Sequence, residues 1–267
     1  MRIVTWNLNR RSTPSAWNAL FDLQPDIALL SEVTHMPGKI SGYEKAFEWA
    51  TNITSGKEQN FMTGILVKGE ILEPFELISM KEWVNKALRA YSGNFVCRQI
   101  RLSNPKSYTV VSVHMPYNKF PYNEFTDDDI SDVILPNYND IYMSDLLWST
   151  LTNMVPNFQH ESIVGGDFNT SEYYGKTRKQ RDANLETILR MYRLGYVEAI
   201  RGVVDGLPGD SIPTFKHSRE KTPSKHQLDH LYLTQKMFDR SSSIVGDVDT
   251  YLKFSDHLPI ISDIKDD

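Results

Sequence analysis

The chain has 267 residues, of which 40% are hydrophobic and 11% aromatic, and its formal net charge is −5 at pH 7. This composition is typical of a globular protein with a sizeable core, and it excludes a disordered or collagen-like chain. The negative charge also excludes a uniformly basic nucleic-acid-coating protein, so local basic patches or a metal ion would have to hold any polyanionic partner.

Cysteine content and hydropathy restrict the kind of protein further. Cys97 is the only cysteine, which excludes an internal disulfide framework and predicts no disulfide-linked partner. The first residues lack the long apolar segment of a secretory signal, and no stretch approaches the ~20 apolar residues of a membrane span. We therefore expect a cytoplasmic protein without a membrane span, and the sequence leaves its oligomeric state open.

Predicted strands and helices are interleaved along the chain. Residues 2–8 form the first predicted strand, and the helix that follows has Ser12 or Thr13 as its N-cap and Pro14 in its first turn. The nearly continuous apolar run 26–33 predicts a strand buried on both faces. Further strands are expected at 61–69, 95–102, 108–115, 161–168, 212–217, 226–234, 243–252 and 258–264, and further helices at 142–155 and 184–195. This mixture favours an α/β layered sandwich of two packed sheets with helices outside.

One stretch interrupts this pattern. The chain has no internal repeat and no linker, so we expect a single domain over residues 1–267, with an insertion at about 117–145. The insertion is acidic and rich in aromatic residues, and its length is typical of an inserted or lid-like loop. Two interpretations stay open: a solvated loop with aromatic residues packed beneath it, or a recognition element that restricts the substrate to single strands or short ends.

Polar side chains follow several of the predicted strands. Asn7, Glu32, His114 and Asp167 with Asn169 stand at the ends of strands. Asp229 lies within the predicted strand 226–234, and Asp256 with His257 precedes the strand predicted at 258–264. A single acid at a strand end is usually a turn former. Six distant groups of oxygen or imidazole type, which a layered sandwich can bring to one rim, instead resemble a hard-cation site with acid and base groups.

The motifs that carry these residues have a family pattern. They are TWNLN (5–9), LLSEV (29–33), SVHMP (112–116), GGDFN (165–169), QLDHLYL (227–233) and SDHLPI (255–260). In this order the set resembles the endonuclease/exonuclease/phosphatase superfamily, which includes DNase I, exonuclease III-type enzymes, sphingomyelinases and inositol-polyphosphate phosphatases. The resemblance implies a four-layer, DNase I-like α/β sandwich and Mg²⁺-dependent hydrolysis of a phosphate ester, with Mn²⁺ able to substitute.

The same resemblance implies a metal and a base. Glu32 and Asn7 are oxygen ligands suited to Mg²⁺, and Asp256 would assist metal or water binding. Asp167 is the candidate base for the attacking water, and Asn169 could donate a hydrogen bond to the developing phosphorane charge. The glycines before Asp167 are expected to let a ligand approach closely.

Two histidines complete the expected site. His257 would face the phosphate, with Asp229 holding its tautomer and stabilising its charged form. His114 stands where DNase I-like and sphingomyelinase-like members have a histidine and apurinic endonucleases have a tyrosine. That difference argues against a specialist for abasic sites.

Two basic clusters flank catalytic motifs and suggest contacts to further phosphates. The first contributes Lys176, Arg178, Lys179 and Arg181, and the second contributes Lys216, Arg219, Lys221 and Lys225. Tyr173 and Tyr174 could stack bases beside the first cluster. The sequence thus favours a nuclease on DNA or RNA. The alternatives are a phosphatase or phosphodiesterase of inositol phosphate, nucleotide or sphingolipid headgroups, and a non-catalytic binding module.

Overall fold

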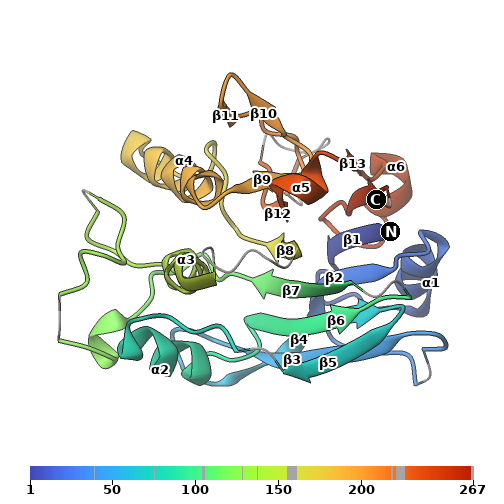
Figure 1. The fold of residues 1–267 in the computed structure, drawn as a ribbon, viewed down its shortest axis with the longest axis horizontal. Helices are drawn as coiled ribbons and strands as arrows, with labels where there is room; N and C mark the ends of the chain where they lie inside the picture. The colour runs from blue at the N-terminus through green and yellow to red at the C-terminus, as the bar shows by residue number, and fades with distance from the viewer. Residues whose placement is uncertain are drawn as a thin grey trace.

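The computed structural model describes residues 1–38, 40–74, 76–103, 106–127, 129–136, 138–154, 161–217, 219–220 and 226–265. Two six-stranded mixed sheets dominate it (Figure 1). The first has the order β13 (Ser241–Val245), β14 (Ile260–Ile264), β1 (Arg2–Asn7), β2 (Ile27–Val33), β4 (Glu58–Val67) and β3 (Glu44–Thr51). The second has the order β5 (Glu70–Pro74), β6 (Phe95–Arg101), β7 (Ser107–His114), β8 (Glu161–Asp167), β12 (Asp229–Thr234) and β9 (Tyr196–Glu198).

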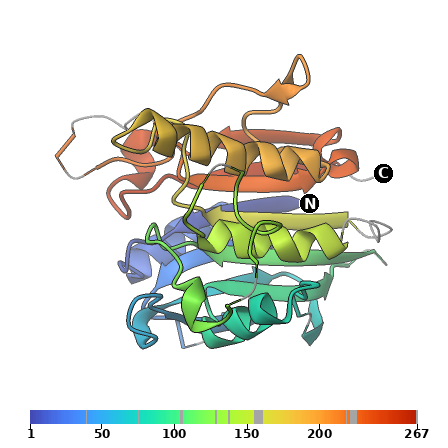
Figure 2. The ribbon, with the colours of Figure 1, turned by 90° about the vertical axis from the view of Figure 1, so that its left-hand side faces the viewer.

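Helices cover the outer faces of both sheets. Figures 1 and 2 show α2 (Glu82–Ala90), α3 (Met143–Met154) and α4 (Arg178–Arg193) over the second sheet. The first sheet is covered by α1 (Pro14–Asp22) and by the short α6 (Val248–Tyr251). The remaining short elements are the 3₁₀ turn Tyr122–Glu124, the hairpin of β10 (Val203–Val204) and β11 (Leu207–Pro208), and α5 (Gln235–Phe238).

Three apolar cores separate these layers. Between the sheets lie residues such as Ile27, Val110 and Leu231, and helix residues such as Trp83 and Leu147 pack on the outside of the second sheet. Trp17 of α1 packs with Trp6 on the outside of the first sheet. Two sheets with a helical layer on each outer face make the expected four-layer sandwich, which the structure confirms.

Two parallel strand pairs bring the polar strand ends together. β1 and β2 are parallel, and Asn7 lies opposite Ser31, the residue before Glu32. β7 and β8 are also parallel, and His114 lies opposite Asp167. Because β12 runs antiparallel to β8, its first residue, Asp229, is also paired with Asp167. Strand register alone therefore places three of the predicted site residues side by side.

Several element boundaries differ from expectation. The helix predicted from residue 184 begins at Arg178, where Thr177 and Gln180 form a capping box, a signature that was readable in the sequence. The segment predicted as a strand at 243–252 holds β13 and then the short α6, because Asp247 caps a helical turn. Residues 212–217 form only an isolated bridge, Phe215 to His257, rather than a strand. Thr13 caps α1 as predicted.

The structure also bears on the membrane prediction and on Cys97. Among the described residues, no helix combines the length and the apolar character needed to cross a membrane.

Cys97 is buried in the core beneath α2, and burial raises the pKa of its thiol to about 12. The thiolate is therefore suppressed at this position, as expected for a packed structural cysteine.

Candidate active site

The first sheet contributes Asn7 and Glu32. The Asn7 amide nitrogen donates to Asp167 Oδ2 at 2.9 Å and reaches Glu32 Oε1 at 3.4 Å. A bulge between Leu30 and Val33 interrupts the pairing of β2 with β4, and Glu32 within it has a φ of 52°. That left-handed conformation is costly for a residue with a side chain and often marks functional sites.

The second sheet contributes His114, Asp167 and Asn169. His114 Nε2 lies 3.5 Å from Glu32 Oε1. Asp167 is buried, and its Oδ1 accepts the Asn169 backbone N–H at 2.8 Å. The Asn169 side-chain amide donates to the Met115 carbonyl at 2.8 Å and to Asp167 Oδ2 at 3.2 Å. Three donors thus fix the Asp167 carboxylate before any ligand binds.

The glycines before Asp167 allow close packing, and their role in admitting a ligand stays a prediction. A Cβ on Gly165 would lie 2.8 Å from a methyl group of Leu29 in the other sheet. A Cβ on Gly166, whose φ is +141°, would lie 2.0 Å from the Val113 carbonyl oxygen. The two glycines therefore allow β8 to approach β7 and the opposing sheet, and in this way they help to position Asp167.

Asp229 and His257 form a buried hydrogen-bonded pair. His257 Nδ1 lies 2.8 Å from Asp229 Oδ2, and the backbone of His257 accepts the indole N–H of Trp6 at 2.9 Å. The Asp229 backbone N–H donates to Thr214 Oγ1 at 3.0 Å. This arrangement leaves Nε2 of His257 as the imidazole nitrogen available to a substrate oxygen.

Burial and neighbouring charges shift the pKa values of these groups in different directions. Burial opposes ionisation of Glu32, but the hydrogen bond and charge of His114, with Arg10 and Asn7, lower its pKa to about 2. For Asp167, burial dominates and raises the pKa to about 6, with Asp229 adding to the effect. Burial opposes protonation of His257, yet Asp229 and then Asp167 outweigh it and raise its pKa to about 10. The site therefore combines three kinds of group: Glu32, a carboxylate that stays ionised, Asp167, a carboxylate that titrates near neutrality, and His257, an imidazole that stays protonated.

The donor set fits a divalent cation. Two triads have ligand atoms within 4.8 Å of one another: Glu32, His114 and Asp167, and Asp167, Asp229 and His257. The first triad, together with Asn7, offers two carboxylates and an amide oxygen, which are the oxygen ligands that a hard cation prefers, so it is the better cation site. Asp256 also has a raised pKa, caused first by burial, and its buried Oδ1 accepts no hydrogen bond in the structure. A metal-bound water could satisfy that atom.

Sequence reasoning missed several supporting residues. Arg10 Nε lies 3.0 Å from Glu32 Oε2, and the Arg10 guanidinium sits 4.7 Å from the centre of the Phe61 ring. Ser255 donates to the Asn7 carbonyl at 2.7 Å and accepts the His257 N–H at 3.1 Å. The Phe215 ring lies 4.9 Å from the imidazole of His257. Of these supporting residues, only Ser255 was indicated by a sequence motif, because it is the first residue of SDH (255–257).

The predicted basic residues divide into four pairs. Lys176 and Lys179 line a cavity of about 630 Å³ beside Asn169, which we call the side cavity. Arg178 points to solvent near Asp182, and Arg181 donates to the Gly175 carbonyl at 3.1 Å. The Lys216 backbone N–H bonds to the Asp256 carbonyl at 2.8 Å, which places its segment beside the site, and Arg219 is exposed. Lys221 and Lys225 lie outside the described residues.

Several solved structures share the fold. The catalytic domain of Xenopus laevis APE2 is 16% identical, with a TM-score of 0.66 over 99% of this chain and 92% of that one. The 3′ phosphatase NExo from Neisseria, bound to a product DNA hairpin, is 15% identical, with a TM-score of 0.61 over 99% of each chain. The endonuclease domain of TRAS1, a telomere-specific non-LTR retrotransposon, is 18% identical, with a TM-score of 0.56 over 99% of this chain and 98% of that one. At these identities the likeness shows the fold.

The sequence comparisons identify the family. Comparison with curated proteins found no sequence match. The profile of the Endonuclease/Exonuclease/phosphatase family matches residues 4–257, which include Asn7, Glu32, Asp167 and His257. The chain therefore belongs to the endonuclease/exonuclease/phosphatase family, whose members are hydrolases that act on phosphate esters.

Proposed function

We propose that the chain is a Mg²⁺-dependent phosphodiesterase that acts as a nuclease on DNA or RNA. One observation carries this proposal: the ends of β2, β7 and β8 and the start of β12 bring three carboxylates and the imidazole of His114 together, beside the charged imidazole of His257. An excess of buried carboxylates suits a hard cation, which would in turn attract the negative charge of a phosphate ester. When bound, the metal would neutralise phosphate charge or stabilise the leaving oxygen.

Asp167 is proposed as the base that orients or deprotonates the attacking water. Hydrogen bonds from Asn7 and Asn169 hold its carboxylate in one orientation, and its raised pKa of about 6 suits proton acceptance near neutral pH. Both side-chain N–H groups of Asn169 are already used, by Met115 and Asp167. Asn169 therefore acts first as a positioning residue, and its donation to phosphorane charge stays a prediction.

His257 is proposed to hold a phosphate oxygen. Its Nδ1 is engaged by Asp229, so Nε2 can donate a charge-assisted hydrogen bond to the substrate. Asp229 fixes the ring orientation and raises the pKa of the imidazole. This pair thus stabilises negative charge as it develops on the phosphate.

A second candidate is a phosphodiesterase of lipid-linked headgroups. The hairpin of β10 and β11 exposes the apolar side chains of Val203, Val204 and Leu207, of which Val204 and Leu207 are each 60% exposed. Exposed apolar side chains on a protruding hairpin suit contact with a lipid surface. The DNA-bound NExo structure, the endonuclease domain of TRAS1 and the lysines beside Asn169 favour the nuclease.

A cleavage panel tests the proposal. Purified protein with Mg²⁺ would be given single- and double-stranded DNA, RNA, abasic duplex, inositol phosphates and sphingomyelin vesicles. We expect cleavage of a nucleic acid that is lost in EDTA and restored by added Mg²⁺. Asp167→Asn should lower the rate by about 10²–10⁴-fold, the usual contribution of a general base. The exposed Asp22→Asn is the matched control and should cleave like wild type. Cleavage of sphingomyelin alone would overturn the nuclease proposal and favour a phosphodiesterase of lipid-linked headgroups.

A further inference from the structure

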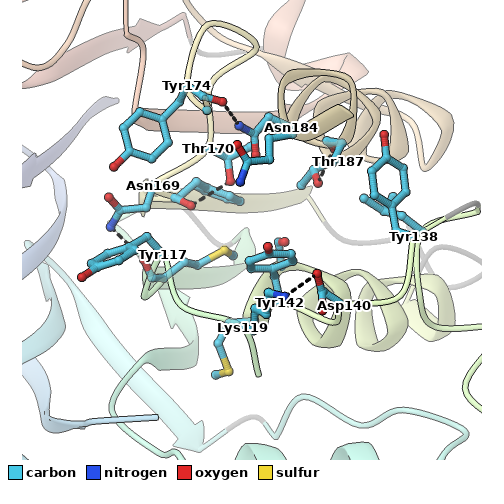
Figure 3. A pocket seen from close by; sticks show the side chains of 18 of the residues that line it. Tyr117, Lys119, Tyr138, Asp140, Tyr142, Asn169, Thr170, Tyr174, Asn184 and Thr187 are labelled. Atoms are coloured by element: carbon cyan, nitrogen blue, oxygen red, sulfur yellow. Dashed lines mark hydrogen bonds and ion pairs between the residues drawn. The ribbon is translucent and has the colours of Figure 1, made fainter. Parts of the chain in front are cut away.

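The side cavity lies between two segments that are distant in sequence. One wall is the loop after β7, from Met115 to Ser144, and the other is the stretch from Phe168 into the first turns of α4. Figure 3 shows Tyr174 and Tyr117 on opposite walls with Asn169 between them. Since Asn169 contacts Asp167, the cavity opens directly beside the proposed base.

The loop wall is rigidly built. The buried Arg190 of α4 donates to the carbonyls of Val133 and Ile134 and to Asp145, at 3.0, 2.8 and 2.7 Å. The two ends of the loop are joined by a hydrogen bond from the Phe120 N–H to the Ile141 carbonyl at 2.7 Å. A loop held in this way forms a cavity before a ligand arrives, which lowers the ordering cost of binding.

Two acidic side chains of the insertion that lie at or near the cavity, Asp140 and Asp145, are neutralised by ion pairs. Asp140 is paired with Lys119 at 2.8 Å, and Asp145 is paired with the buried Arg190 at 2.7 Å. On the opposite wall stand two lysines, Lys176 and Lys179, the second of which lies 5.3 Å from the centre of the Tyr138 ring. The lining thus combines tyrosine rings with local positive charge.

This lining and size match one kind of ligand. A volume of about 630 Å³ lies within the range of small-molecule pockets. Aromatic rings bind the face of any base, and lysines bind phosphate without base specificity. We propose that the side cavity is a subsite for a single unpaired nucleotide next to the scissile phosphate, an inference that rests on the proposed nuclease function.

The proposal predicts a strand preference. A base that enters the cavity must leave the helical stack, which costs a few kcal/mol in duplex and little in a single strand. Single strands and frayed ends should therefore be cleaved faster than continuous duplex. The insertion acts as a recognition element in this reading, through its tyrosines.

The test compares two substrates of the same enzyme. Initial rates would be measured in Mg²⁺ for a short single-stranded oligonucleotide and for bis(p-nitrophenyl) phosphate, a diester without a base. Loss of one stacking ring should lower the ratio of the two rates about tenfold, from the ~1–3 kcal/mol that a stacked base contributes. We expect that fall in Tyr174→Ala and in Tyr117→Ala, while Tyr174→Phe should keep most of the ratio.

Tyr173 provides the matched control. The sequence suggested Tyr173 as a second stacking residue, but it is 47% exposed and, unlike Tyr174, does not line the cavity. Tyr173→Ala should therefore leave the ratio unchanged. An unchanged ratio in both cavity variants would overturn the subsite while leaving the proposed function intact. If wild type hydrolyses neither substrate, the proposed function fails. The subsite is then judged by fluorescence anisotropy of the labelled oligonucleotide, where Tyr174→Ala must weaken binding and Tyr173→Ala must not.

Discussion

The strand-end cluster around Asp167 and the side cavity beside it are adjacent, yet they are built by different means. In the cluster, backbone pairing sets the positions: His114, Asp167 and Asp229 are direct neighbours across three strands. In the cavity, a loop supplies one wall, and a buried arginine, Arg190, holds that loop. The chemistry is thus fixed by the sheets, whereas the contacts beside it depend on side chains.

This difference explains how one family can keep a reaction and change its substrates. Register in a buried sheet cannot shift by one residue without turning every side chain to the other face. A loop anchored by few contacts can change length and sequence at little cost to the sheets beneath it. Substitutions should therefore separate the two regions experimentally.

The largest effect is expected from removing the anchor of the loop. Arg190→Met would leave Asp145 buried without its cation and two carbonyls without donors, because Arg190 and Asp145 are almost fully buried. Breaking a buried pair in this way costs about 3–5 kcal/mol of unfolding free energy, which urea denaturation would measure. Arg193→Met on the same helix removes an exposed ion pair with Glu186 and should cost about 1 kcal/mol or less. Equal losses in both variants would show that the loop is not anchored by Arg190.

A smaller effect, specific to the strand-end cluster, should depend on pH. The folded-state pKa of His257 is about 10, above the ~6.5 of an unfolded histidine. The charged imidazole therefore contributes stability that is fully present below about pH 6.5 and is lost as the pH rises through about 10. In metal-free protein, the stability difference between wild type and Asp229→Asn should shrink by a few kcal/mol over this range. A difference that stays constant with pH would mean that Asp229 does not hold the charge on His257.

The smallest effect should come from the rim of the side cavity. Lys176 is exposed at the wall and is proposed to contact a phosphate. Lys176→Ala should weaken binding of single-stranded oligonucleotides of any sequence and reduce the salt dependence of log Kd by about 1. Lys45→Ala, an exposed lysine on β3, should leave the slope unchanged. Fluorescence anisotropy at several salt concentrations would distinguish the two variants. Equal slopes of log Kd against log salt would show that Lys176 does not contact a phosphate of the bound strand.

The two regions also differ in how far the sequence predicts them. Each residue of the strand-end cluster stands directly before, within or after a predicted strand and has metal-binding or acid–base chemistry, so both the layered fold and the candidates were visible. The Glu32 bulge and the support from Arg10 were not, because they depend on local backbone geometry and on packing against Phe61. The side cavity was harder still to predict from the sequence. It depends on the contacts of Arg190 with Val133 and Asp145, and no local sequence pattern encodes such contacts.

The pairing of β1 with β14 has a consequence for the timing of folding. Ser255 donates to the Asn7 carbonyl across 248 residues of sequence, and Trp6 donates to His257 across 251. Contacts of such long range form late, because the intervening chain must first be brought together. A chain still emerging from the ribosome holds Asn7 and Glu32 but lacks His257. The candidate site can therefore form only after the segment that carries Ser255 and His257 has been synthesised, so no shorter N-terminal portion of the chain contains it.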